Sequence, residues 1–225
     1  MLLLAIDTAT SAITVALHDG DRVLAESSTV DARRHGEYLA PGIAEVLARC
    51  GHTPADVSAV VAGTGPGPFT GLRIGLVTAR TFAFACGVPV FGLCSLDALA
   101  HQAWLEAAAE LGQSCIVATD ARRKEVYWAR YDMTGRGMVR SGQPMVAKAT
   151  AIAREVGGLP VIGRGAVLYA ESFGPRVGPL DVSAGALAAL AAQRLAAGEV
   201  LPEALPMYLR RPDAMPRAPR KPALP

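Results

Sequence analysis

The stretch GTGPGPFTGLRIG, residues 63 to 75, has the composition of a loop that holds a phosphate. Its glycines, including Gly67 and Gly71, would let backbone N–H groups approach an anion, and a following helix would direct its N-terminus at the same place. A tight strand-to-helix connection, in which glycine and proline only turn the chain, explains the same residues. The stretch alone leaves both interpretations open.

Two aspartates follow predicted strands, where a carboxylate could work with such a loop. Asp7 ends the run LLLAI, and the adjacent Thr8 offers a hydroxyl, but IDTATSA contains no glycine to wrap a phosphate. Asp120 lies in TDARRKE, where two bulky arginines would obstruct close backbone approach. Gly163, in VIGRGA, is a candidate for a nucleotide pocket. Carboxylates satisfied by turn amides and a plain strand-to-helix turn are the alternatives at these positions.

Metal and serine hydrolase chemistry has little support in the sequence. The four histidines are isolated, and none forms the HxxxH or HExxH spacing that places two imidazoles on one helical face. The chain also contains no GxSxG motif, the strand-to-helix turn that presents a nucleophilic serine. We therefore expect no metal site and no serine nucleophile.

The elements that would position these residues begin with an antiparallel group of strands. Hydrophobic patterning predicts strands over 2–6, 13–17 and 22–30, with Asp19-Gly20 turning the chain between the last two. Helical periodicity follows at 36–50, 72–86 and 95–111, with strands at 57–63 and 88–93 between these helices. Ser95 is expected to cap the third helix through its hydroxyl.

A second, thinner copy of this pattern follows. It comprises predicted strands at 114–121, 124–132, 137–143 and 159–163 and helices at 149–156 and 183–197. The order predicts an α/β protein with the ribonuclease H-like, actin-like ATPase (ASKHA) fold, built as two tandem βββαβα-type domains of which the second is reduced. We expect domains over 1–108 and 109–210, followed by a flexible tail, 211–225, rich in proline and basic residues.

Composition narrows the functional classes. The chain is 51% hydrophobic and 19% charged, with a net charge of +2, so it can bury a core and has no global electrostatic attraction to nucleic acid. The apolar run before Asp7 is far shorter than the roughly 18 residues of a membrane span and predicts a buried strand. The four cysteines show no CxxC pair, which is typical of a reduced, cytoplasmic protein.

The predicted helix 72–86 stands out because apolar residues surround it on all sides. A helix that is apolar on every face must be covered on every face, so we expect an intermolecular interface. Small residues spaced by four would leave a smooth groove for another helix. The alternative is a helix enclosed by its own sheet and neighbouring helices. The predicted contact residues are Leu72, Leu76, Ala79 and Ala83, with Tyr38, Ile43 and Leu47 from helix 36–50.

Several segments together resemble the TsaB family, also called YeaZ, across nearly the whole chain. They are AIDTATSAITVAL, HGEYLAPGI, GTGPGPFTGLRIGLVTA, VFGLCSLDALA, TDARRKEVYWARY and ALPMYLRRP. Two positions depart from the family pattern: Pro68 replaces a more usual serine, and Arg164 replaces a usual acidic residue. Both departures weaken a ligand-binding role for the residues around them.

The resemblance implies a non-catalytic subunit that pairs with TsaD, the metal-dependent transferase that modifies the adenosine beside the anticodon in tRNAs reading codons that begin with A. TsaD carries an HxxxH metal motif, whereas the matching positions here are Ser95 and Leu99. The family pairs through its first two helices in a four-helix bundle, with the ATPase TsaE docking against the pair. The chain alone would form a homodimer, and ATP and a metal ion are expected on the partner subunits.

Two further functions remain as alternatives. An ATPase or sugar kinase would use Asp7 with the glycine-rich loop, and the weak nucleotide-site candidates are then Asp7, Thr8, Gly67, Gly71, Asp120 and Gly163. A metallopeptidase-like hydrolase is disfavoured by the missing metal motif. Contact with tRNA is expected to be indirect or weak, and the sequence leaves open whether Arg122, Arg123 or the basic tail takes part.

Overall fold

A computed structural model describes residues 1–31, 34–135 and 137–210, and the predicted basic tail lies outside these residues. The first half forms a five-stranded sheet in the order β3-β2-β1-β4-β5. Its strands are β1 (Leu3–Asp7), β2 (Ala12–His18), β3 (Val23–Val30), β4 (Ala59–Gly63) and β5 (Val90–Leu93). β2 runs antiparallel to β1 and β3, whereas β4 is parallel to β1 and β5. The predicted strands and their directions are confirmed.

The second half forms a four-stranded sheet in the order β8-β7-β6-β9. Its strands are β6 (Ser114–Asp120), β7 (Glu125–Thr134), β8 (Gly137–Lys148) and β9 (Val161–Ile162). β8 is longer than predicted because it stays paired with β7 as far as Lys148, opposite Glu125. The helix α4 (Ala149–Val156) matches its prediction, whereas the short helix α5 (Arg164–Leu168) was not predicted.

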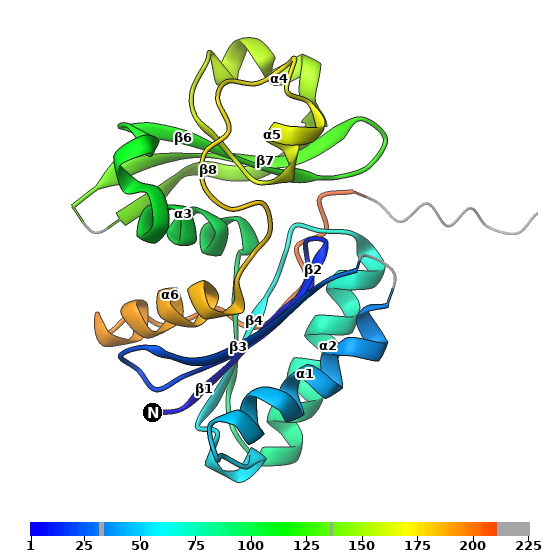
Figure 1. Cartoon of the computed structure of the whole chain (residues 1–225), viewed down its shortest axis with the longest axis vertical. Helices are drawn as coiled ribbons and strands as arrows, with labels where there is room; N and C mark the ends of the chain where they lie inside the picture. The colour runs from blue at the N-terminus through cyan, green and yellow to red at the C-terminus, as the bar shows by residue number, and fades with distance from the viewer. Residues whose placement is uncertain (32–33, 136, 211–225) are drawn as a thin grey trace, which may run out of the picture.

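Four helices cover the first sheet and the space between the two sheets (Figure 1). α1 (His35–Arg49) and α2 (Phe69–Cys86) pack on one face of the first sheet. α3 (Ser95–Leu111) and α6 (Ala184–Ala196) form a middle layer in which α3 packs on β6, β7 and β8 while α6 packs on β1, β2 and β3. Each of these two helices therefore lies against the sheet of the other half of the chain.

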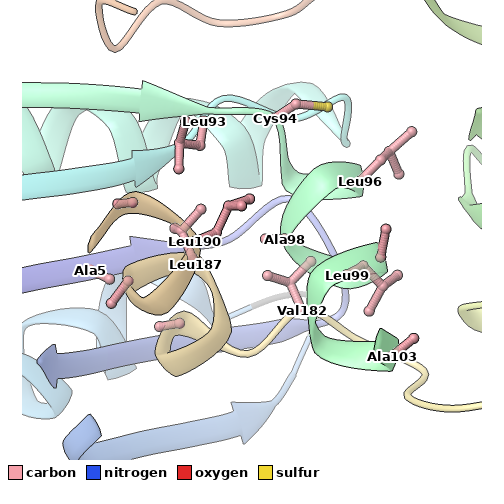
Figure 2. Packing of buried hydrophobic residues seen from close by; sticks show 14 of the residues in the cluster. Ala5, Leu93, Cys94, Leu96, Ala98, Leu99, Ala103, Val182, Leu187 and Leu190 are labelled. Carbon is pink, nitrogen blue, oxygen red and sulfur yellow. The ribbon is translucent and has the colours of Figure 1, made fainter. Parts of the chain in front are cut away.

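The middle layer has an apolar core that joins the two halves. Leu99 of α3 and Leu187 and Leu190 of α6 lie in one buried cluster with Leu3 and Ala5 of β1, part of which is drawn in Figure 2. Hydrophobic burial on this scale, at roughly 25 cal/mol per Å² of apolar surface, makes the contact between the halves part of the fold. The ribonuclease H-like architecture predicted from the sequence is confirmed.

Two of the four cysteines behave as small hydrophobic core residues. Cys94 and Cys115 are buried, and burial raises the pKa of both thiols to about 12. All four cysteines are free thiols. Within the described residues, no helix combines the length and the apolar character that a membrane span requires.

Candidate functional site

The glycine-rich loop connects β4 to α2 and packs against the turn between β1 and β2. α2 begins at Phe69 rather than at the predicted Leu72, directly after Pro68. A Cβ atom built at Gly67 would lie 2.5 Å from the carbonyl oxygen of Ala9, so only glycine permits this approach to the β1–β2 turn. The absence of a side chain at Gly67 is thus required by packing inside the chain.

The first turns of α2 lie against the end of β1 in the same way. The Thr8 hydroxyl donates a hydrogen bond of 2.7 Å to the carbonyl of Gly71, and a Cβ atom at Gly75 would lie 2.2 Å from Thr8 Oγ1. The small residues of α2 allow the helix to approach its own sheet. The Thr8 hydroxyl is occupied by this contact and is not a free phosphate donor.

Asp7 is completely buried and joins three segments of the chain. Its Oδ1 accepts the Ala9 N–H at 2.8 Å, and its Oδ2 accepts the Ser95 hydroxyl at 2.5 Å. Ser95 Oγ in turn accepts the Gly65 N–H at 3.1 Å. A Cβ atom at Gly63 would overlap the Asp7 carboxyl, which explains the glycine at the end of β4. The prediction that Ser95 caps α3 is wrong, because its hydroxyl is used by Asp7 and Gly65.

Burial also changes the acidity of this carboxyl. Desolvation raises the pKa of Asp7 from 3.8 to about 6, although the hydrogen bonds from Ser95 and Ala9 oppose the shift. A carboxylate that binds magnesium in a nucleotide site has to reach solvent or ligand, and this one faces Ser95 and a backbone amide. The residues at this place do not fit a magnesium–nucleotide complex.

The other two nucleotide-site candidates also have roles within the fold. Asp120 Oδ1 accepts the Arg122 N–H at 2.7 Å, and its Oδ2 lies 3.0 Å from Arg122 Nη1, so the carboxylate fixes the β6–β7 turn. A Cβ atom at Gly163 would lie 2.5 Å from the carbonyl oxygen of Ala118, and the Gly163 N–H donates to the carbonyl of Pro179. At both positions these contacts give the residue a role within the fold.

A cavity of about 270 Å³ does open between the two halves, and it brings together two of the six nucleotide-site candidates. Gly71 and Asp120 line it, whereas Asp7 and Gly163 are absent from its lining. Arg164 closes one side through a bidentate ion pair with Asp181, with contacts of 2.6 to 3.0 Å, which gives the unusual arginine a structural partner. Thr119 also lines the cavity, and its buried hydroxyl has no hydrogen-bond partner among the described residues.

The structure places the predicted partner-contact residues inside the chain's own core. Tyr38 is half-buried, and the other six are buried against the first sheet: Ile43, Leu47, Leu72, Leu76, Ala79 and Ala83. They are buried because the face of α2 with the small residues is the one that approaches β1. A partner that contacts α1 and α2 would therefore meet their outer faces rather than these residues.

Those outer faces carry a different set of residues. On α2, Val77 is 62% and Phe84 is 89% exposed, and Arg73 and Arg80 lie on the same side of the helix. On α1, three alanines one turn apart are exposed: Ala40, Ala44 and Ala48. The two charges in α2, Arg73 and Arg80, are the sequence signal that could have identified this outer face.

Within the residues that the structure describes, no group of three or more histidine, cysteine, aspartate or glutamate side chains could hold a metal ion. His101 is buried beside Trp104, with ring centroids 5.5 Å apart. Desolvation, with a smaller contribution from the Arg194 charge, lowers the pKa of His101 to about 4. At neutral pH this histidine is an uncharged core residue.

Comparisons with known proteins agree on one family. Residues 22–203 match the family model described as TsaD: tRNA N6-adenosine threonylcarbamoyltransferase. A protein of Mycobacterium tuberculosis is 44% identical over 96% of this chain and 94% of its own length. Escherichia coli TsaB, named as a tRNA threonylcarbamoyladenosine biosynthesis protein, is 37% identical over 61% of this chain, and the match spans 58% of that protein.

The likeness to a solved structure extends over the whole fold. YeaZ from Pseudomonas aeruginosa superposes with a TM-score of 0.77 at 34% sequence identity, covering 92% of this chain and 99% of that one. The superposition covers both halves of the chain and the middle layer between them. The sequence match to the TsaD model also extends over both halves. The chain therefore belongs to the family that the TsaD model describes and, within it, to the TsaB branch, also called YeaZ.

Proposed function

We propose that the chain serves in tRNA threonylcarbamoyladenosine biosynthesis as a non-catalytic subunit that pairs with TsaD. The names of its Escherichia coli and Bacillus subtilis relatives support the pathway. In this role the chain activates TsaD, which modifies the adenosine 3′ of the anticodon in tRNAs reading codons that begin with A. TsaE joins the pair, ATP and the metal ion belong to the partner subunits, and the complex works in the cytoplasm.

The observation that carries the non-catalytic role is the environment of Asp7. This carboxyl stands at the end of the first strand, where a phosphate-transferring relative would need it, yet it is buried and held by Ser95. The positions that match the TsaD metal motif support the same role, because Ser95 is occupied by Asp7 and Leu99 is fully buried in the core.

The pairing surface that we propose is the outer face of α1 and α2. The exposed alanines of α1 offer a smooth helical surface that another helix can approach closely, and Val77 and Phe84 of α2 add apolar area. Exposed large apolar side chains beside a smooth helical surface are typical of a contact surface. In the absence of TsaD the same surface would join two copies of this chain.

Reconstitution of the modification tests the proposal. Purified TsaD and TsaE are supplied with an unmodified tRNA, a threonylcarbamoyl donor and ATP, with or without this chain, and modified adenosine is measured by mass spectrometry. We expect modification to require the chain and to be retained with the variant Asp7→Asn. An Asp7→Asn chain that folds and pairs with TsaD but supports no modification would show that Asp7 has a catalytic role.

A further inference from the structure

A second cavity, of about 330 Å³, lies at the outer edge of the space between the two halves. Three segments line it: Gly67–Phe69, Ala121–Arg123 with Tyr127, and Tyr208–Arg210. We name it the aromatic–arginine groove. Three arginines and three aromatic rings line it, and the described lining residues include no carboxylate. Arginine combined with aromatic rings is the side-chain chemistry that holds unpaired nucleotides.

The aromatic part of the groove consists of a partly exposed ring pair. Phe69 is 37% and Tyr208 is 41% exposed, and their ring centroids lie 5.1 Å apart at an interplanar angle of 33°. The guanidinium carbon of Arg73 lies 4.4 Å from the centre of the Phe69 ring. A flat base can stack on the open side of such a pair, and the arginine adds positive charge beside it.

The cationic part is a turn with an unusual backbone. Arg122, Arg123 and Lys124, between β6 and β7, all have positive φ angles, of 61°, 54° and 62°. Glycine adopts this left-handed conformation without steric cost, so three successive long cationic side chains there are unfavourable for the fold. Strained backbone of this kind is often found at functional sites, where the side chains take part in binding or catalysis.

Neighbouring groups that are not part of the groove lining, together with one backbone carbonyl, hold two of the arginines in place. Asp120 pairs with Arg122, and Glu125 pairs with Arg210, whose Nη1 also donates to the carbonyl of Ala121 at 3.0 Å. A guanidinium has five N–H donors, so one carboxylate partner leaves further donors for a phosphate. The groove therefore presents oriented cations beside a stacking surface.

We propose that the aromatic–arginine groove binds unpaired nucleotides of an RNA strand, with a base stacked on Phe69 and Tyr208 and phosphates held by Arg122, Arg123 and Arg210. An acidic peptide would satisfy the arginines but would leave the exposed ring pair without a role. The choice of RNA rests on the proposed function in tRNA modification. The small net charge of the whole chain, +2, means that binding depends on this local cluster.

Fluorescence anisotropy of a labelled 12-nucleotide unstructured RNA with the full chain tests the proposal. We expect Tyr208→Ala to weaken binding by about tenfold and Tyr208→Phe to leave it unchanged, because the phenyl ring preserves stacking. The double variant Arg122→Ser/Arg123→Ser should lower the salt dependence, log K against log salt, by about 1.4. Arg22→Ser/Arg49→Ser, on the β2–β3 hairpin and α1, removes the same charge elsewhere and should have little effect.

Equal effects of the two double variants, or unchanged binding by Tyr208→Ala, would overturn the groove as the site. Preference for the base-paired form of the same RNA, or for AMP alone over the strand, would overturn unpaired RNA as its occupant. The proposed function is tested separately, since the groove variants at Tyr208, Arg122 and Arg123 change no residue of α1 or α2. Absence of RNA binding by the wild-type chain, with intact modification, would contradict the groove alone. Absent modification with intact RNA binding by the wild-type chain would contradict the proposed function alone.

Discussion

Replacing Asp7 by asparagine should change how the stability of the chain depends on pH. Desolvation raises the pKa of Asp7 from 3.8 to about 6, so the folded state binds this proton more tightly than the unfolded state. Its contribution to stability is therefore complete below pH 3.8 and is lost as the pH rises through 6. Two units of pKa correspond to about 3 kcal/mol between the extremes, and linkage gives about 1 kcal/mol of this between pH 5 and pH 7.

Urea unfolding of the wild type and of Asp7→Asn at pH 5, 6 and 7 measures this contribution of Asp7 to the free energy of unfolding. Asparagine does not titrate, so the stability of the wild type relative to the variant should rise by about 1 kcal/mol from pH 7 to pH 5. Other titrating groups, including His101, are the same in both proteins and cancel in the difference. A difference that stays constant, or falls toward pH 5, would refute the buried, hydrogen-bonded Asp7 described above.

Three further predictions concern residues with defined environments. The stability of the wild type relative to His101→Gln should fall by up to about 3 kcal/mol in urea titrations as the pH decreases from 6.5 toward 4, since the pKa of buried His101 is lowered to about 4. Lys124→Gly should raise the free energy of unfolding by about 1 kcal/mol, because it relieves a positive φ; a lower thermal midpoint would contradict this. Gly75→Ala should destabilise by about 2 kcal/mol through its clash with Thr8, and an unchanged midpoint would show that α2 can shift.

Most of the secondary structure could be predicted because it depends on local patterns. The buried strand ahead of Asp7 and the Asp19-Gly20 turn follow from alternation and turn chemistry, and both are present. The predicted start of α2, at Leu72, is later than the observed start at Phe69, because the neighbouring glycines favour a loop at Phe69 and Thr70. The arrangement of α3 and α6 depends on contacts between the two halves, which no local pattern encodes.

The site was harder to predict because its contacts join distant residues. Ser95 binds Asp7 across 88 positions of sequence, and Arg164 binds Asp181 through side chains whose pairing nothing local indicates. The error on α2 has a different cause: a helix that is apolar all round does not reveal which face meets its own sheet. The close approach of Gly75 to Thr8 decides it, and that approach is visible only in three dimensions.

In the proposed complex, the chain pairs with TsaD through the outer face of α1 and α2. Val77→Glu places a carboxylate on this face at a position that is 62% exposed, whereas Ala79→Glu buries one in the core, where Ala79 is fully enclosed. An unpaired buried charge is strongly destabilising, so Ala79→Glu should unfold the chain. Val77→Glu should leave the fold intact, and so should Ala151→Glu, a control on the exposed side of α4.

Co-purification of tagged TsaD with each variant is the most direct test of this claim. Circular dichroism of the isolated chains shows first which of them are folded. We expect that the wild type and Ala151→Glu co-purify with TsaD in equal amounts and that folded Val77→Glu does not. Full recovery of folded Val77→Glu with TsaD would contradict pairing through this face.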